Sequence, residues 1–351
     1  MRQQPRPYSR CCQSPRNSRS ALPGRGLAPP SALREVLMKK SLLLMAALLL
    51  VGCTATKPES SSTASPPPIT RSSSTSSPTT SAEASGESCR EKASGPKTMS
   101  YAERSGAEQN LTSLDVYLPP GCGLAPVLMW VHGGGWRRGD KSNGMKQKVA
   151  WAESLGAALV SVNYRLTTSD SGVQWPDHGQ DVAAAVAWVQ QNGPAEGLDP
   201  TKLTLIGHSA GAHLVAIVAT DQALLTTAGA DPAKVSCVVA LDFSFDLASA
   251  PADKMIDDAF GTDPQVIASA SPNVQIERNG APSARFLIAT RGGRGRVADA
   301  QAFVDLVNTS GGSAELVDAS PYTHNQVSTQ LGAADDTLVT PAVSEFVQSC
   351  N

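Results

Sequence analysis

The stretch 203-LTLIGHSAGAHLVAIVAT-220 decides the fold, because it joins an apolar run to a helical run through Gly207-His208-Ser209-Ala210-Gly211. A G-x-S-x-G that follows a strand and opens a helix indicates a nucleophile elbow, a tight turn that holds a serine hydroxyl clear of the sheet. The two glycines are needed because the turn brings its neighbours too close for side chains. Ser209 is therefore predicted to be a nucleophile that attacks carbonyl carbons.

Around this turn the sequence alternates strands and helices, which indicates one α/β domain over residues 97–351 with a mainly parallel central sheet. Residues 243–284 are irregular and rich in Ala, Asp, Pro and Ser, and we expect them to form a small lid. Strands are expected at 114–118 (antiparallel), 127–131, 157–163, 203–206, 235–241, 285–290 and 314–317, and helices at 181–191, 300–307 and 341–348.

The N-terminal part has three segments. Residues 1–37 are rich in Arg and Pro without core-building periodicity, and are interpreted as a non-native extension upstream of a second start at Met38. Residues 38–53 join two lysines, a short apolar run and Leu-Val-Gly-Cys, a secretion signal whose end resembles a bacterial lipobox. Residues 54–96 are dominated by Ser, Thr and Pro and are expected to be a disordered linker.

The lipobox resemblance implies cleavage before Cys53 and attachment of a lipid to its thiol. The protein would then lie outside the cytoplasm, anchored to the cell membrane by that lipid only. An ordinary signal peptide or an uncleaved anchor is the alternative.

The charge balance disfavours one class of partner, and the cysteine and histidine content bears on metal sites and disulfides. From Ala55 onward there are 20 Lys and Arg against 30 Asp and Glu, an acidic balance that disfavours nucleic acid as a partner. No C-x-x-C or His-x-x-x-His spacing indicates a metal site. Four cysteines follow Cys53: Cys89, Cys122, Cys237 and Cys350. An even number in a protein outside the cytoplasm permits two disulfides, and the sequence leaves their pairing open. For Cys237 the alternative is a free buried thiol.

Four motifs in this order resemble the α/β-hydrolase superfamily: V-H-G-G-G-W at 131–136, G-D-K at 139–141, N-Y-R-L at 163–166 and G-H-S-A-G-A-H-L at 207–214. Within it they are similar to the esterase and lipase branch that includes hormone-sensitive-lipase-like and feruloyl-esterase-like enzymes. The resemblance covers residues 101–347 and implies the α/β-hydrolase fold with no cofactor. It also implies an oxyanion hole made by the backbone N–H groups of Gly134, Gly135 and Ala210, which would stabilise the charge on a carbonyl oxygen under attack.

A serine hydroxyl is a poor nucleophile until a base takes its proton, and histidine is the usual base. The chain has five histidines. Four are placed by their context in the glycine loop, in the elbow, one helical turn after Ser209, or before a helix: His132, His208, His213 and His178. His324 follows the last expected strand, where the superfamily's chain order places the base, and is predicted to be that base.

The acid, the third member of the expected catalytic set with Ser209 and His324, departs from the family pattern. The superfamily's acid lies in the loop after the strand that is here 286–289, but residues 290–298 hold three arginines and no carboxylate. Asp299 is the nearest substitute and is our first choice, although it would serve equally as a helix N-cap. Asp246 and Asp242, after the preceding strand, are the alternatives, as is a Ser–His dyad without an acid.

These features together favour a serine hydrolase that acts on a small-molecule ester with a short acyl group, through an acyl-enzyme intermediate. An amidase or peptidase on the same fold is the first alternative, and a non-catalytic binding protein that keeps the fold is the second. Tyr164-Arg165 is interpreted as a structural loop that braces the glycine run, although Arg165 would bind an acidic substrate if it faced a pocket.

Overall fold

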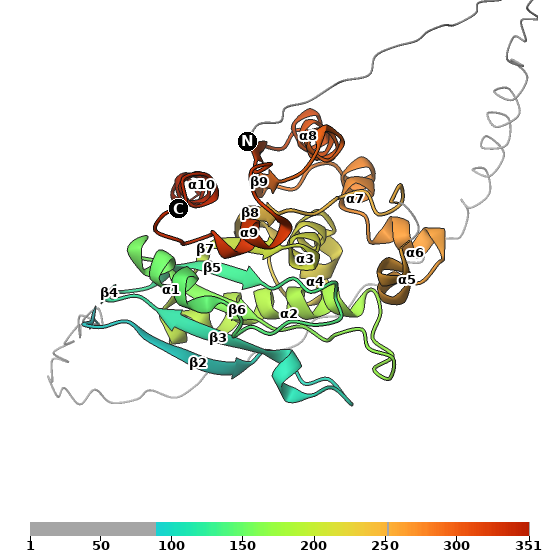
Figure 1. Cartoon of the computed structure of the whole chain (residues 1–351). Helices are drawn as coiled ribbons and strands as arrows, with labels where there is room; N and C mark the ends of the chain where they lie inside the picture. The colour runs from blue at the N-terminus through green and yellow to red at the C-terminus, as the bar shows by residue number, and fades with distance from the viewer. Residues whose placement is uncertain (1–88, 251–252, 351) are drawn as a thin grey trace, which may run out of the picture. The chain divides into compact units, whose positions relative to one another are not determined.

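Eight strands form one sheet in the order β10-β9-β8-β7-β5-β6-β3-β2 (Figure 1), in a computed structural model that describes residues 89–250 and 253–350. The six strands from β10 to β6 run parallel, and β3 and β2 are antiparallel to their neighbours. The strands are β2 (Ser94–Ser100), β3 (Ser113–Leu118), β5 (Ala125–Val131), β6 (Ala158–Val162), β7 (Leu198–His208), β8 (Val235–Leu241), β9 (Arg285–Thr290) and β10 (Ala314–Asp318).

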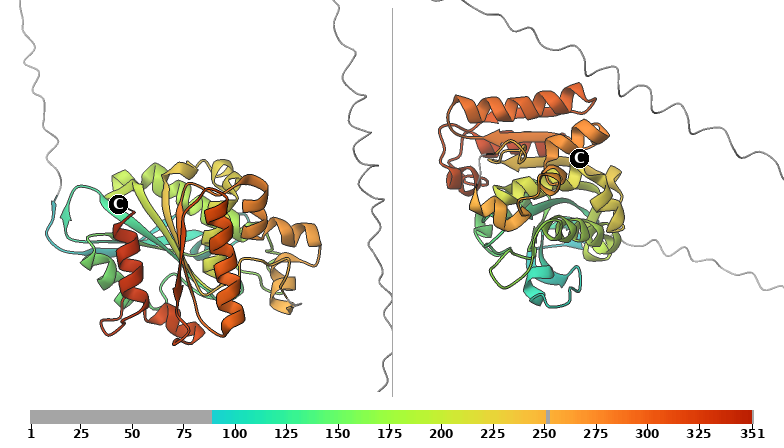
Figure 2. Two further views of the ribbon diagram at one scale, coloured as in Figure 1. Left: turned by 90° about the horizontal axis from the view of Figure 1, so that it is seen from above. Right: turned by 90° about the vertical axis from the view of Figure 1, so that its right-hand side faces the viewer.

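Helices cover both faces of this sheet, and α8 and α10 lie on opposite sides of β10 (Figure 2). Side chains alternate along a strand, so Val127 and Met129 enter the core under α2, α3 and α8, whereas Leu128 and Trp130 enter the core under α1, α9 and α10. These helices are α1 (Met145–Ser154), α2 (Asp177–Asn192), α3 (Ala210–Thr220), α8 (Arg294–Thr309), α9 (His324–Thr329) and α10 (Val339–Gln348).

Four further helices are short: α4 (Gln222–Thr227), α5 (Lys254–Phe260), α6 (Pro264–Ser269) and α7 (Pro272–Asn279). The last three lie between β8 and β9, in the segment where the sequence predicts a small lid. Asp253 and Asp263 cap α5 and α6 by accepting backbone N–H groups, and Pro264 and Pro272 occupy first helical turns. This capping chemistry explains why a segment without helical periodicity is helical.

The expected mainly parallel sheet is confirmed, and the bounds of β8 and β9 agree with the strands predicted at 235–241 and 285–290. The three predicted helices all begin earlier than expected, α10 by two residues, at Val339 instead of 341. The second helix, α2, begins at Asp177 instead of 181, and α8 begins at Arg294 instead of 300. The earlier start of α8 decides the fate of one site prediction below.

The linker expected over 54–96 ends too late. Residues 89–96 belong to the fold, because β1 (Cys89–Arg90) pairs with β4 (Gly121–Cys122) and β2 begins at Ser94. Disulfides join Cys89 to Cys122 and Cys237 to Cys350. The alternative of a free thiol at Cys237 is therefore wrong.

Several expectations lie outside the described residues: the extension 1–37, the signal at 38–53 with Cys53, and the linker as far as residue 88. Within residues 89–250 and 253–350, the structure contains no helix with the length and apolar character needed to cross a bilayer.

Candidate active site

Ser209 occupies the sharp turn between β7 and α3. Its backbone has φ 55° and ψ −123°, a strained conformation for a residue with a side chain. The turn is held because the Ser209 N–H donates to the carbonyl of Leu241 on β8 at 2.8 Å. A Cβ at Gly211 would overlap the backbone carbonyls of Val131 and His132 on the neighbouring strand, so only glycine fits there. The structure thus has the elbow that the sequence predicts.

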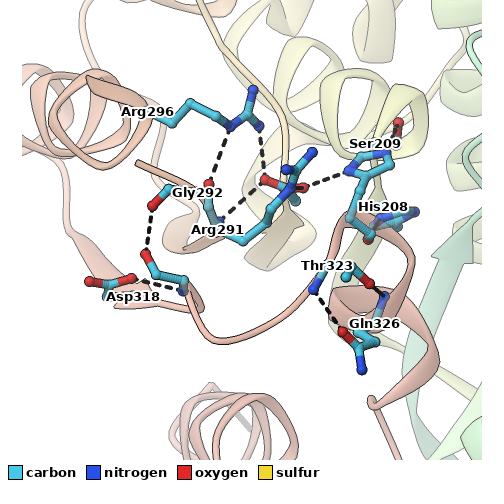
Figure 3. Close-up of polar contacts among 11 residues, drawn as sticks. His208, Ser209, Arg291, Gly292, Arg296, Asp318, Thr323 and Gln326 are labelled. Atoms are coloured by element: carbon cyan, nitrogen blue, oxygen red, sulfur yellow. Dashed lines mark hydrogen bonds and ion pairs between the residues drawn. The ribbon is translucent and has the colours of Figure 1, made fainter. Parts of the chain in front are cut away.

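His324 comes to this turn from a distant part of the chain, the end of the loop between β10 and α9. The loop after β10 ends in a capping box, in which Thr323 and Gln326 bond each other's backbone N–H groups, and this fixes His324 as the first residue of α9 (Figure 3). Nε2 of His324 lies 2.9 Å from Oγ of Ser209. The structure therefore brings together the nucleophile and the base that the sequence predicts.

Asp242 completes the chain of hydrogen bonds. Its carboxylate Oδ2 lies 2.5 Å from Nδ1 of His324. The carboxylate accepts, so Nδ1 carries the proton and Nε2 is left to accept the hydroxyl proton of Ser209. Asp242 directly follows β8, its φ is 56°, and its N–H donates to the carbonyl of Ala289 on β9 at 2.7 Å. The residue is only 1% exposed.

The preference for Asp299 as the acid is wrong on geometry. Because α8 begins at Arg294 after a cap at Gly293, Asp299 lies inside the helix, and the alternative of a helix N-cap is wrong as well. Asp299 and Asp246 line a separate cavity of about 570 Å³. Asp246 instead accepts the backbone N–H of Ser249 at 3.0 Å. Of the sequence-based alternatives, Asp242 is the carboxylate that contacts His324.

Two of the three arginines in the loop where the superfamily has its acid, Arg291 and Arg296, bind Asp242. Both arginines are labelled in Figure 3. Arg291 Nε lies 2.9 Å from Oδ2, and Arg296 Nη2 lies 2.8 Å from Oδ1. Burial raises the pKa of Asp242, but the hydrogen bonds from His324, Arg291 and Arg296 outweigh it and hold the pKa well below its usual range. Asp242 is therefore ionised while it orients His324. The sequence contains a signal for this pairing, the three arginines in the loop where a carboxylate is expected, but only the structure shows that two of them bind Asp242.

His208 ties the elbow to the loop of the base. Its Nε2 donates to the backbone carbonyl of His324 at 2.8 Å, and the two rings lie 4.6 Å apart. Burial, followed by the nearby charge of His324, lowers the pKa of His208 to about 4. At neutral pH His208 is thus an uncharged hydrogen-bond donor that positions the neighbouring imidazole.

The glycine loop follows β5 and faces the same point. Gly134 has φ 119°, and a Cβ there would overlap the backbone carbonyl of Arg138. Within the described residues, the N–H groups of Gly134, Gly135 and Ala210 donate to no protein acceptor, so they are free to bind an oxygen. Ala210 begins α3, whose N-terminus adds a positive dipole. These are the three donors that the resemblance implies.

Arg165 and its neighbour have the structural role that the sequence favoured. Arg165 Nε lies 2.7 Å from Oδ2 of buried Asp181, and its Nη1 lies 3.1 Å from Asp177. Tyr164 donates its hydroxyl to the carbonyl of His132 at 3.1 Å and so braces the glycine loop. Arg165 does not line the cavity at Ser209.

A cavity of about 940 Å³ opens over these groups. Within the described part of the chain no cluster of His, Cys, Asp or Glu side chains is arranged to hold a metal ion. The cavity is lined by Trp130, His132, Gly133, Gly134, Gly135, Arg137, Arg138, Gly139, Asn143, His208, Ser209, Met255, His324, Asn325 and Ser328.

Comparison with known families gives one match: the BD-FAE family model covers residues 114–290, half of the chain. Among curated proteins, esterase LipQ of Mycobacterium tuberculosis is 39% identical over 118 residues, or 32% of this chain and 27% of that protein. Carboxylesterase NlhH of the same organism is 35% identical over 122 residues, or 33% of this chain and 37% of that protein. The chain thus spans only about a quarter to a third of the length of such relatives.

Solved structures agree on the fold. A hyperthermophilic esterase from Pyrobaculum calidifontis superposes with a TM-score of 0.59 at 22% identity, covering 75% of this chain and 86% of that one. Esterase B from Lactobacillus rhamnosis gives 0.59 at 20% identity with the same coverage. The α/β-hydrolase fold implied by the sequence motifs is confirmed.

Proposed function

This chain belongs to the BD-FAE family, and on that premise we propose that it is a carboxylesterase-type hydrolase with Ser209 as its nucleophile. The observation that carries the proposal is the hydrogen-bonded series Ser209–His324–Asp242, whose first two members line one cavity together with the unpaired backbone N–H groups of the glycine loop. The esterase names of the curated relatives support the reaction class.

In the first half of the reaction, Oγ of Ser209 forms a bond to the ester carbonyl carbon while its proton passes to Nε2 of His324. The carbonyl oxygen becomes an oxyanion that accepts hydrogen bonds from the N–H groups of Gly134, Gly135 and Ala210, worth roughly 3 kcal/mol per donor. Asp242 stabilises the imidazolium. His324 then gives the proton to the leaving alkoxide, which departs as an alcohol.

In the second half, His324 takes a proton from water, and the hydroxide attacks the acyl-enzyme carbonyl. The new oxyanion collapses, the bond to Ser209 Oγ breaks, and the proton on His324 returns to the serine. A carboxylic acid leaves and the resting site is restored. No cofactor enters either half.

We propose short acyl esters as the substrates, supported by the short lid helices α5 to α7, of which only Met255 lines the cavity. A missing acid would favour the non-catalytic binding protein, but the carboxylate of Asp242 contacts His324, so this alternative loses its support. No observation favours an amidase or peptidase over an esterase.

The test uses the purified protein, a fluorophosphonate probe and p-nitrophenyl esters of two to ten acyl carbons. We expect the probe to label Ser209, as read by peptide mass, and kcat/KM to fall with acyl length. If the probe labels no residue and no ester is turned over, the enzyme proposal is refuted. A kcat/KM that rises with acyl length would refute the short-acyl part alone.

Removing the Arg296 charge should lower kcat/KM. Arg296 Nη2 lies 2.8 Å from Oδ1 of buried Asp242, and without it this oxygen loses its charged partner, so the carboxylate that orients His324 is held less firmly. Arg296 is 42% exposed, which limits the effect, and we expect a loss of roughly threefold for Arg296→Gln. Arg294→Gln on the same helix is the control. An unchanged kcat/KM for Arg296→Gln would contradict this role.

We also propose that the protein acts outside the cytoplasm, held to the membrane through lipidated Cys53. The signal-like sequence at 38–53 supports this, as do the two disulfides, which persist in oxidising compartments. Cys53→Ser should move the protein from the membrane fraction to the soluble fraction, whereas Thr54→Ser at the next residue should not. A Cys53→Ser protein that stays with membranes would disprove the anchor.

A further inference from the structure

The cavity at Ser209 has an unusual charge for this protein. Two arginines, Arg137 and Arg138, line it, and none of its lining residues in the described part of the chain is Asp or Glu. The sequence from Ala55 onward nevertheless holds 30 acidic residues against 20 Lys and Arg. A cavity lined by one sign of charge concentrates ligands of the opposite sign.

Arg138 is the available cation of the pair. Its side chain is exposed, and within residues 89–250 and 253–350 it has no ion pair and no side-chain hydrogen bond. Arg137 is partly compensated, because its Nη1 lies 3.3 Å from Asp258, a carboxylate that also pairs with Lys254 at 2.7 Å.

The other cations near the site are committed to partners. Arg291 and Arg296 bind Asp242, and Arg165 binds Asp181. Lys148 is buried over the ring of Trp130 and donates to the carbonyl of Ser328 at 3.0 Å. A negative group that enters the cavity therefore meets Arg138 as its free partner.

The backbone of Arg138 is held at a set position relative to the reacting atoms. It belongs to the loop that carries the oxyanion donors, and Arg137 N–H closes a turn onto the carbonyl of Gly134 at 3.3 Å. The loop is anchored by Trp136, which is fully buried and packs edge-on against Phe260 at 4.8 Å. The loop fixes the backbone of Arg138, and its flexible side chain extends from there.

We propose that the substrate is an ester that also carries a carboxylate, and that Arg138 binds this second group. A guanidinium offers two parallel N–H donors that match the two oxygens of a carboxylate, which neutral esters lack. The ester carbonyl lies at Ser209 while the carboxylate pairs with Arg138. This inference rests on the proposed esterase activity and adds the substrate class.

The experiment compares matched esters with the carboxylate on either side of the ester bond. One pair is 4-acetoxybenzoate and its methyl ester, and the other is mono-p-nitrophenyl glutarate and p-nitrophenyl pentanoate. Each kcat/KM is divided by the hydroxide-catalysed rate constant of the same ester, which removes intrinsic reactivity. At low ionic strength we expect at least one acidic ester to exceed its neutral partner by about tenfold.

Two further arms assign the preference. In 0.5 M NaCl, where charges are screened beyond about 4 Å, the ratio should fall severalfold. Arg138→Gln should reduce the ratio to below about twofold, whereas Arg138→Lys should keep part of the ratio. Arg294→Gln, an exposed arginine outside this cavity, should behave as the unmodified protein.

The outcomes separate the two proposals. If no ester is hydrolysed, the proposed function fails. If the neutral esters are hydrolysed but neither acidic ester is preferred, or if the preference survives Arg138→Gln, the esterase stands and the inference about Arg138 is wrong.

Discussion

Asp242→Asn should lower kcat by about 10⁴-fold, and Asp299→Asn should change it less than twofold. An amide at position 242 still fits beside the ring but offers its N–H₂ to Nδ1, which favours the tautomer with the proton on Nε2. That tautomer cannot accept the proton of Ser209. The measurement is kcat with p-nitrophenyl butyrate for both variants.

Asp242→Asn leaves two arginines beside a neutral group, so folding must be checked separately by the near-ultraviolet circular dichroism of the buried tryptophans. Asp246→Asn is the matched control, because Asp246 also follows β8 but lines the other cavity. If Asp299→Asn or Asp246→Asn abolishes turnover while Asp242→Asn does not, the assignment of the acid is refuted.

Ser209→Ala should show the largest loss, about 10⁶-fold in kcat, because no acyl-enzyme can form. A small residual rate above that of water is expected from the oxyanion donors, since the N–H groups of Gly134, Gly135 and Ala210 do not depend on the serine hydroxyl. Alanine keeps the backbone N–H of position 209 that holds the turn, so the fold should persist.

Ser328→Ala is the control for Ser209→Ala, because Ser328 lines the same cavity. Its backbone carbonyl, which the substitution leaves in place, accepts a hydrogen bond from Lys148. We expect its kcat to stay within a few-fold of the unmodified protein and the fluorophosphonate label to remain on Ser209. A Ser209→Ala protein that keeps a tenth of its activity would show that another residue is the nucleophile.

The sequence was sufficient to predict features that depend on a few consecutive residues. The elbow at Ser209 is written in five consecutive residues, because its geometry demands glycines at fixed positions. The strands at 235–241 and 285–290 were predicted with the bounds that the structure has, since they are uninterrupted apolar runs. His324 was reached by elimination and chain order, and the structure places it against Ser209.

Local patterns predicted less where packing and capping outweigh periodicity. The lid helices α5 and α6 begin at the side-chain caps Asp253 and Asp263. Helix α8 begins at Arg294 and not at residue 300, so Asp299, which the sequence places at the end of a loop, lies inside the helix. The disulfide partners also needed the fold, because Cys237 and Cys350 are 113 residues apart and meet only when α10 packs on the sheet.

The acid was decided by tertiary structure alone. The sequence predicts a nucleophile and a base, and it shows that residues 290–298 hold arginines in place of a carboxylate. Only the parallel pairing of β8 with β9, in which Leu241 lies opposite Ala289, places Asp242 beside Arg291. A carboxylate contacts an imidazole through space, and residues 82 positions apart become neighbours only when the sheet has formed.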